Sequence, residues 1–220
     1  EKYRIDTVLI CDHKKKVLFD AKIIINANPC QSKFKYSDSK STYLMGHKYM
    51  IMDPSYKNIK RKKINKHINS ILVSVGGTDQ NDMIYQVIEL IENSISNSKV
   101  NIYSSSSSKT YISKLKLYLN KNKYNNSYRL FLDVKNFYNS WWKNDIAITA
   151  SGNTLFERIA SGLPGVSISQ FSQQFYIAQQ FDIMGLNCNL NFTSGETLLN
   201  HDKFTKFISN RKIVIEQFKK

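Results

Sequence analysis

Strand-like and helix-like segments alternate from residue 71 onward, and this alternation is the feature that most constrains the fold. ILVSVGG (71–77) is typical of a buried strand that ends in two glycines, and DMIYQVIELI (82–91) follows it with apolar side chains three and four positions apart. Further strands are predicted at 100–105, 128–133, 146–150 and 165–169, and further helices near 112–119, 137–142, 154–161 and 173–181. Elements of these lengths require right-handed crossovers, so the sequence predicts a parallel sheet with helices on both faces, a Rossmann-type α/β domain.

Three parts are expected along the chain: residues 1–56, a basic linker at 57–70, and the Rossmann-type domain at 71–220. The first part holds strand candidates at 4–11 and 21–28 and a further apolar segment at 43–52, and the last part ends in an amphipathic helix predicted over 204–218. Because 56 residues are too few for a second domain of the same kind, we expect the first part to be the remainder of an N-terminal α/β domain whose preceding segment is missing.

The net charge of +15 raises the question of an anionic partner. Most lysines are scattered among Asn, Ser, Ile and Tyr, and only KNIKRKKINK (57–66) forms a true basic cluster. We expect this cluster to be a solvated linker. No nucleic-acid partner is expected, because base-stacking aromatic side chains are not interleaved with the lysines. A weak contact with a phosphate or a membrane surface stays open. The sequence contains neither a membrane-spanning run nor a signal peptide, which favours a cytoplasmic protein.

The cysteines and histidines do not indicate a disulfide framework, a metal or a cofactor. The 3 cysteines are widely spaced without a Cys-x-x-Cys pair, and the 4 histidines are dispersed without a His-x-x-x-His pair. No Gly-x-Ser-x-Gly motif supports a serine hydrolase.

Two polar loops follow predicted strands, at the sheet edge where α/β proteins bind ligands. The first, Gly76-Gly77-Thr78-Asp79, lets the backbone approach a ligand closely, or it is a simple turn whose Asp79 or Thr78 caps the next helix. The second, Ser151-Gly152-Asn153-Thr154, offers hydroxyl, amide and backbone donors at a helix start, which suits a phosphate.

Glu157 has two interpretations. Thr154 and Glu157 match a capping box, in which the glutamate would bond back to the first residue of the helix. A carboxylate at this place could equally accept both hydroxyls of a ribose. The spacing alone leaves the two open.

Longer stretches resemble a known superfamily. ILVSVGGTDQND and DVKNFYNSWWKNDIAITASGNTLFERIASGLPGVSISQFSQQ resemble the C-terminal domain of GT-B proteins such as the UDP-N-acetylglucosamine transferase of peptidoglycan synthesis. They are more similar still to the UDP-2,4-diacetamido-2,4,6-trideoxy-β-L-altropyranose hydrolase family of pseudaminic acid biosynthesis, as are ICDH (10–13), FDAKIIINANP (19–29) and YLMGHKYMIM (43–52). The resemblance covers most of residues 5–190 and implies a GT-B-like fold.

The resemblance also implies roles for individual residues. Gly76 and Gly77 would face a diphosphate, Ser151, Gly152 and Asn153 would bind phosphate or uridine, and Glu157 would hold the ribose. Gln173 and Gln174 would face the sugar, and Asn26 and Asn28 would lie where the N-terminal half meets the cleft. Cys11, His47 and Asp53 depart from the pattern of the hydrolase family, and its glycine-rich loop with a histidine is absent here, so no catalytic residue is assigned.

The expected function is hydrolysis of a UDP-linked amino sugar, releasing a 2,4-diacetamido-trideoxyhexose. Two alternatives stay open: a GT-B glycosyltransferase that uses a UDP-amino sugar, and a non-catalytic module that binds a nucleotide sugar.

Overall fold

The computed structural model describes residues 6–13, 16, 20–36, 40–58, 65, 67–76, 79, 81–105, 108–121, 123–191, 193 and 198–219. The chain forms two compact units, Glu1–Asp53 and Pro54–Lys220. Half of the predicted basic linker, at 59–64 and 66, lies outside the described residues.

The first unit contains a small parallel sheet. Its strands are β1 (Val8–Cys11), β2 (Ile23–Asn26) and β3 (Thr42–Met45), in the order β1-β2-β3. Two short 3-10 helices follow strands here, η1 (Pro29–Lys33) and η2 (His47–Tyr49). The strand candidates of the sequence therefore form, although each is shorter than its apolar segment.

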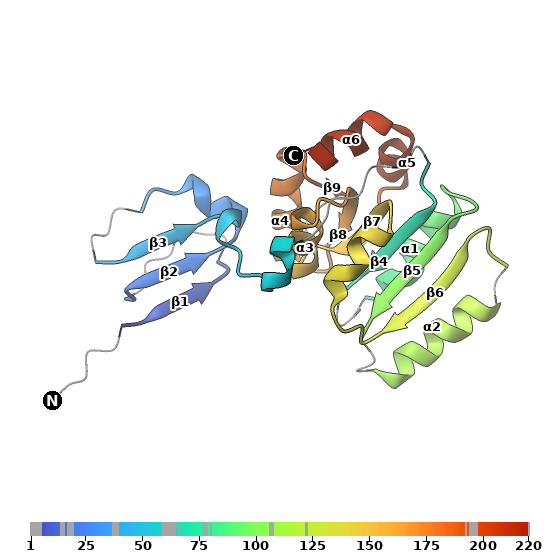
Figure 1. Cartoon of the computed structure of the whole chain (residues 1–220), viewed down its shortest axis with the longest axis horizontal. Helices are drawn as coiled ribbons and strands as arrows, with labels where there is room; N and C mark the ends of the chain where they lie inside the picture. The colour runs from blue at the N-terminus through green and yellow to red at the C-terminus, as the bar shows by residue number, and fades with distance from the viewer. Residues whose placement is uncertain are drawn as a thin grey trace. The chain divides into compact units, whose positions relative to one another are not determined.

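The second unit is built on a six-stranded parallel sheet, ordered β6-β5-β4-β7-β8-β9 (Figure 1). The strands are β4 (Ser70–Ser74), β5 (Lys99–Ser104), β6 (Ser127–Leu132), β7 (Ile146–Ala150), β8 (Gly165–Ile168) and β9 (Cys188–Asn189). The chain runs outward from β4 to β6, returns to β7 beside β4, and then runs outward the other way. The order of strands therefore reverses between β4 and β7, the place where open α/β sheets bind ligands.

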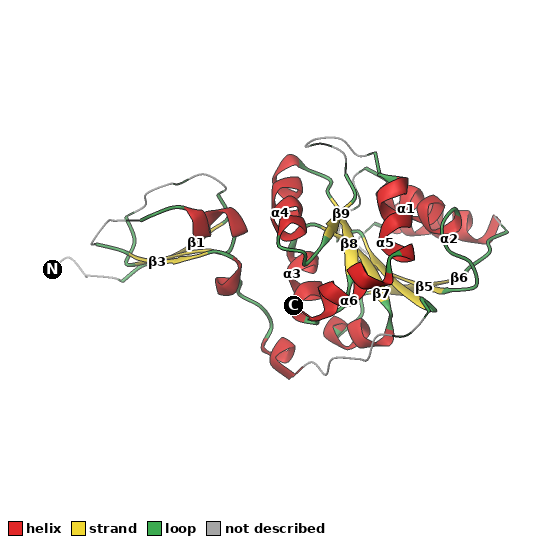
Figure 2. Ribbon diagram, turned by 90° about the horizontal axis from the view of Figure 1, so that it is seen from above, coloured by secondary structure: helices red, strands yellow, loops and turns green. Residues whose placement is uncertain are grey.

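Helices cover both faces of this sheet (Figure 2). They are η3 (Pro54–Asn58), α1 (Met83–Glu92), α2 (Lys109–Lys121), η4 (Phe137–Lys143), α3 (Asn153–Ala160), α4 (Ser172–Ile183), α5 (His201–Ser209) and α6 (Arg211–Lys219). Among the described helices, none is both long and apolar enough to cross a membrane.

Alternate residues of the strands feed two apolar cores. Ile71 and Val73 of β4 pack with α1, α2, α5 and α6, whereas Leu72 between them packs with Trp141 of η4. Successive side chains of a strand point to opposite faces, so a strand that is apolar throughout must be covered on both sides. The predicted Rossmann-type α/β architecture is thus confirmed.

The predicted C-terminal helix over 204–218 is wrong in one respect, because two helices occupy this region. The chain breaks at Asn210, whose ψ of 87° is not helical, and Oδ1 of Asn210 accepts a hydrogen bond of 3.2 Å from the backbone nitrogen of Lys212. Asn competes for backbone bonds in this way at helix starts, which ends α5 and begins α6.

Candidate functional site

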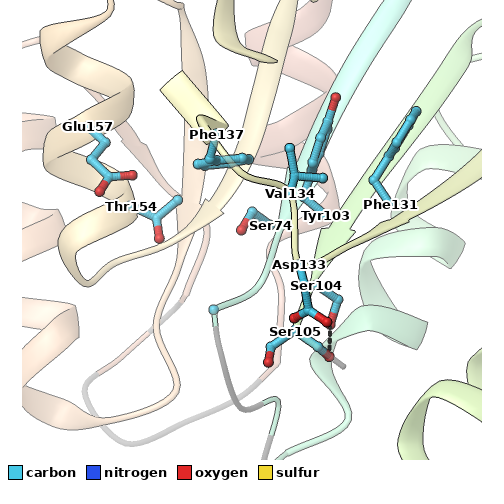
Figure 3. A pocket seen from close by; sticks show the side chains of 11 residues that line it. Ser74, Tyr103, Ser104, Ser105, Phe131, Asp133, Val134, Phe137, Thr154 and Glu157 are labelled. Atoms are coloured by element: carbon cyan, nitrogen blue, oxygen red, sulfur yellow. Dashed lines mark hydrogen bonds between the residues drawn. The ribbon is translucent and has the colours of Figure 1, made fainter. Parts of the chain in front are cut away.

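A cavity of about 250 Å³ opens at the carboxyl ends of β4, β5 and β6, beside the start of α3 (Figure 3). We name it the strand-end cavity. It is lined by Ser74, Gly76, Tyr103, Ser104, Ser105, Phe131, Asp133, Val134, Phe137, Thr154 and Glu157. All of these residues belong to the second unit, and the cavity lies next to the reversal of strand order between β4 and β7.

Aromatic side chains form one wall of the strand-end cavity. Tyr103 and Phe131 are paired in register at the ends of β5 and β6, and their rings stack with centroids 4.9 Å apart. The ring of Phe137 meets Tyr103 edge-on at 5.2 Å and also contacts Trp141 at 4.9 Å. This rigid apolar wall suits a flat ring, because aromatic faces stack favourably on nucleobases.

Polar groups lie beside the aromatic wall, where β5 and β6 end. Ser104, Ser105 and Asp133 line this side, and the backbone nitrogen of Asp133 donates to the carbonyl oxygen of Ser104 at 3.1 Å. Asp133 has a φ of +46°, a left-handed conformation that is uncommon for residues other than glycine and that clusters at functional sites. Hydroxyl and carboxylate groups thus line the cavity beside the aromatic wall.

The first two turns of α3 form the opposite side of the cavity. Gly152 is the residue before the helix, and no side chain at this position caps the helix start. Thr154 is consequently the second helical residue, which places Glu157 too far along for a capping box. That interpretation of Glu157 is wrong. Both side chains line the cavity and lie across from its aromatic residues (Figure 3).

Gly76 lines the cavity two residues after the end of β4, with a φ of +101° that only glycine adopts readily. Gly77 and Thr78 lie outside the described residues. The carboxylate of Asp79 accepts from the backbone nitrogens of Met83 and Ile84 at 2.8 and 2.9 Å, so it caps α1. Burial raises the pKa of Asp79 above its ordinary value.

The other described residues proposed for the second unit lie at the starts of α3 and α4 and do not line the strand-end cavity. Ser151 is buried, and its hydroxyl donates to the carbonyl oxygen of Ile168 at 2.8 Å. Asn153 is exposed at the first helical position. Gln173 is exposed on α4, whereas Oε1 of Gln174 accepts from the backbone nitrogen of Gln170 at 3.0 Å.

Asn26 and Asn28 belong to the first unit and are both buried. Nδ2 of Asn26 donates to the carbonyl oxygen of His13 at 2.9 Å, and its Oδ1 accepts from the backbone nitrogen of Asn28 at 3.0 Å. Oδ1 of Asn28 accepts from the backbone nitrogen of Cys30 at 3.1 Å. Sequence reasoning missed Gln31, a fully buried amide that also donates to the His13 carbonyl. These amides join the loops that follow β1 and β2.

No group of three or more His, Cys, Asp and Glu that could hold a metal ion occurs among the described residues. The groups that line the strand-end cavity offer aromatic stacking and hydroxyl and carboxylate hydrogen bonds, and the start of α3 beside them offers backbone donors.

Comparisons with known proteins relate this chain to glycosyltransferases by fold. No family model matches it. It is 25% identical to an uncharacterized protein of Methanocaldococcus jannaschii over 179 residues, covering 71% of this chain and 36% of that protein. MurG of Acinetobacter baumannii has a similar structure, with a TM-score of 0.64, 13% identity, and coverage of 98% of this chain and 61% of MurG. UGT89C1 of Arabidopsis thaliana, solved with UDP-L-rhamnose, gives a TM-score of 0.53 at 7% identity, covering 91% and 50%.

The chain thus spans less than two thirds of the length of each of these proteins. At such low identity the structural likeness establishes the fold and not the activity. The chain has the α/β fold of the GT-B glycosyltransferases.

Proposed function

We propose that this chain binds the nucleotide of a UDP-sugar in the strand-end cavity and serves transfer of the sugar to an acceptor hydroxyl. The observation that carries the proposal is the pairing of an aromatic wall with Glu157 across a single cavity at the ligand-binding edge of the sheet. A pocket with few polar groups on apolar walls is the usual form of a small-molecule site.

The base, the ribose and the diphosphate of a nucleoside diphosphate would each contact a different group of the strand-end cavity. The base would stack beside Tyr103 and Phe137 and hydrogen-bond to the polar groups at the ends of β5 and β6. The ribose hydroxyls would donate to the carboxylate of Glu157. The diphosphate would lie against Gly76 and the backbone N–H groups at the start of α3, where the helix dipole favours an anion.

The choice of a uridine nucleotide is supported by a protein of similar structure. UGT89C1, which shares the fold, was solved with UDP-L-rhamnose. The sequence resemblance to enzymes of UDP-amino sugars points to an acetamido sugar, so UDP-N-acetylglucosamine is the first donor to test.

Transfer is favoured over hydrolysis because the structural neighbours include MurG and other glycosyltransferases. In transfer, an acceptor oxygen forms a bond to the anomeric carbon while the bond from that carbon to the diphosphate breaks. The acceptor proton leaves to a base, and the UDP leaving group is held by backbone donors. Hydrolysis, suggested by the sequence resemblance, differs only in that water is the acceptor.

Calorimetry with UDP and 2′-deoxy-UDP tests the binding site. Glu157→Gln should weaken UDP binding by about 1–3 kcal/mol, the scale of hydrogen bonds to a charged group, with a smaller effect on 2′-deoxy-UDP. Glu89→Gln, on the exposed side of α1, is the matched control and should change neither affinity. Absence of UDP binding by the unaltered protein would refute the proposal, and equal losses for both ligands would remove Glu157 from the ribose.

A further inference from the structure

Gln170 joins three segments that lie far apart in the sequence. It follows β8 and is 8% exposed, and its Nε2 donates a hydrogen bond of 2.7 Å to the carbonyl oxygen of Val75, 95 positions earlier. Because β7 lies between β4 and β8 in the sheet, this side chain spans the carboxyl end of β7. The bonded carbonyl belongs to the residue immediately before Gly76.

The backbone of Gln170 is held as firmly as its side chain. Its nitrogen donates to Oε1 of Gln174 at 3.0 Å, and its carbonyl oxygen accepts from Nδ2 of Asn81 at 3.3 Å. Val75 and Asn81 stand at the two ends of the connection from β4 to α1, so one residue fixes both ends of that connection.

The same amide set reaches the start of α3. Nε2 of Gln174 lies 3.7 Å from the position that a Cβ on Gly152 would occupy, an ordinary van der Waals separation. Gly76 in turn approaches the end of β7, since a Cβ added to it would lie 3.6 Å from the Cβ of Ala150. Gln170 therefore bonds both to the residue before Gly76 and to Gln174, whose side chain lies beside Gly152.

One feature of Gln170 is not explained by packing alone. Its Oε1 is buried, and among the residues that the structure describes it has no hydrogen-bond partner. Buried polar atoms are nearly always paired, so an unpaired acceptor at this place calls for an explanation. Nε2 of Gln170 donates to the carbonyl oxygen of Val75. An apolar side chain of similar size would therefore remove the unpaired Oε1 and lose only this one side-chain hydrogen bond.

We infer that Gln170 is a positioning residue that sets the spacing between the turns at Gly76 and Gly152, so that both can engage one diphosphate. The inference rests on the proposed function. It assigns Gln170 no contact with the ligand, because the residue acts through the carbonyl of Val75 and through Gln174. Its removal should affect the diphosphate and leave the nucleoside wall at Tyr103 and Phe137 unchanged.

Binding of UDP, uridine and inorganic pyrophosphate to Gln170→Met tests this inference, and Gln217→Met is a matched control. Gln217 is also 8% exposed, and its side-chain amide also bonds to a backbone group: Oε1 of Gln217 accepts from the nitrogen of Gly165, at the opposite end of β8. Both variants lose one buried amide hydrogen bond, so both should lose similar stability in thermal unfolding.

Gln170→Met should weaken binding of UDP and pyrophosphate at least about tenfold, the effect of impairing one hydrogen bond to a charged phosphate, with uridine affinity changed less than about twofold. Gln217→Met should change none of the three affinities. Unchanged UDP affinity in Gln170→Met, or equal losses for UDP and uridine, would overturn the inference while leaving the nucleotide site intact. If the unaltered protein binds neither UDP nor pyrophosphate, the proposed function fails first, and the inference fails with it.

Discussion

The guanidinium of Arg158, a residue of α3, donates a hydrogen bond of 2.8 Å to Oδ1 of Asn187, and both side chains are buried. Arg158 also donates to the carbonyl oxygens of Leu163 and Leu186 at 3.0 and 3.2 Å. Among the described residues no carboxylate forms an ion pair with it, and burial lowers the pKa of Arg158. Arg158 thus ties α3 to the segments before β8 and β9, while its neighbour Glu157 lines the cavity.

Arg158→Met should lower the free energy of unfolding by about 2–4 kcal/mol, because three acceptors, two of them buried, lose their donor. Urea denaturation measures this loss. Arg129→Met is the control, since Arg129 is exposed on β6 and its removal should cost no more than about 0.5 kcal/mol. A loss for Arg158→Met as small as that of the control would show that these hydrogen bonds contribute little.

Two glycines of the second unit should respond differently to alanine. A Cβ on Gly165 would meet the carbonyl carbon and nitrogen of Ala147 at 3.0 Å and its carbonyl oxygen closer still. Gly165→Ala must therefore separate β7 from β8 and should cost at least about 3 kcal/mol of stability, the scale of severe overpacking. Gly152→Ala meets only Gln174 at an ordinary separation and should fold with near-normal stability. Thermal unfolding of the two variants, compared side by side, would contradict this if their losses were equal.

The sequence predicted the fold well because the second unit repeats one simple pattern. Apolar residues recur with different periods in strands and in amphipathic helices, so the two kinds of element can be told apart in the sequence. Strands that alternate with helices of these lengths form a parallel sheet with right-handed crossovers. The break at Asn210 was not predicted, because apolar residues continue on both sides of it. The break depends on a hydrogen bond between the side chain of Asn210 and the backbone nitrogen of Lys212, which the apolar pattern does not show.

The sequence pointed to only some of the residues that line the strand-end cavity. Gly76, Thr154 and Glu157 line the cavity, and each follows a strand in a recognisable loop or helix start. Tyr103 and Phe131 were assigned only to strands, because an aromatic residue at the end of an apolar run has the same pattern whether it is core or cavity wall. Strand register alone brings these two rings together. The role of Gln170 was not predicted for a related reason, because its hydrogen bond to Val75 joins positions that are far apart in the sequence.

Cys188 should resist alkylation in the folded protein. It is 6% exposed, and burial raises its pKa to about 12. The thiolate is the reactive form, so a pKa raised from 9.0 to about 12 lowers its fraction at pH 8 by about a thousandfold. Iodoacetamide labelling followed by peptide mass spectrometry should detect Cys188 only in urea, with the half-buried Cys30 as an internal comparison. Rapid native labelling of Cys188 would show that β9 opens readily.

The aromatic wall leads to the last prediction, which separates the base from the rest of the nucleotide. Phe137→Leu keeps an apolar side chain beside Trp141 but removes the flat ring that faces Tyr103. Stacking of a base on an aromatic ring contributes about 1–3 kcal/mol, so uridine and UDP should both lose affinity in this range, and by the same factor.

The control for this variant is Phe171→Ala. Phe171 is 49% exposed at the start of α4 and does not line the strand-end cavity, so its loss should leave both affinities unchanged. Pyrophosphate binding should be unaffected by Phe137→Leu, the reverse of the pattern expected for Gln170→Met, because the two residues act on opposite ends of the ligand. Calorimetry with the three ligands distinguishes these patterns. If Phe137→Leu weakened pyrophosphate as much as uridine, the base would not lie against this wall, and the nucleotide would have to be placed in the opposite direction along the cavity.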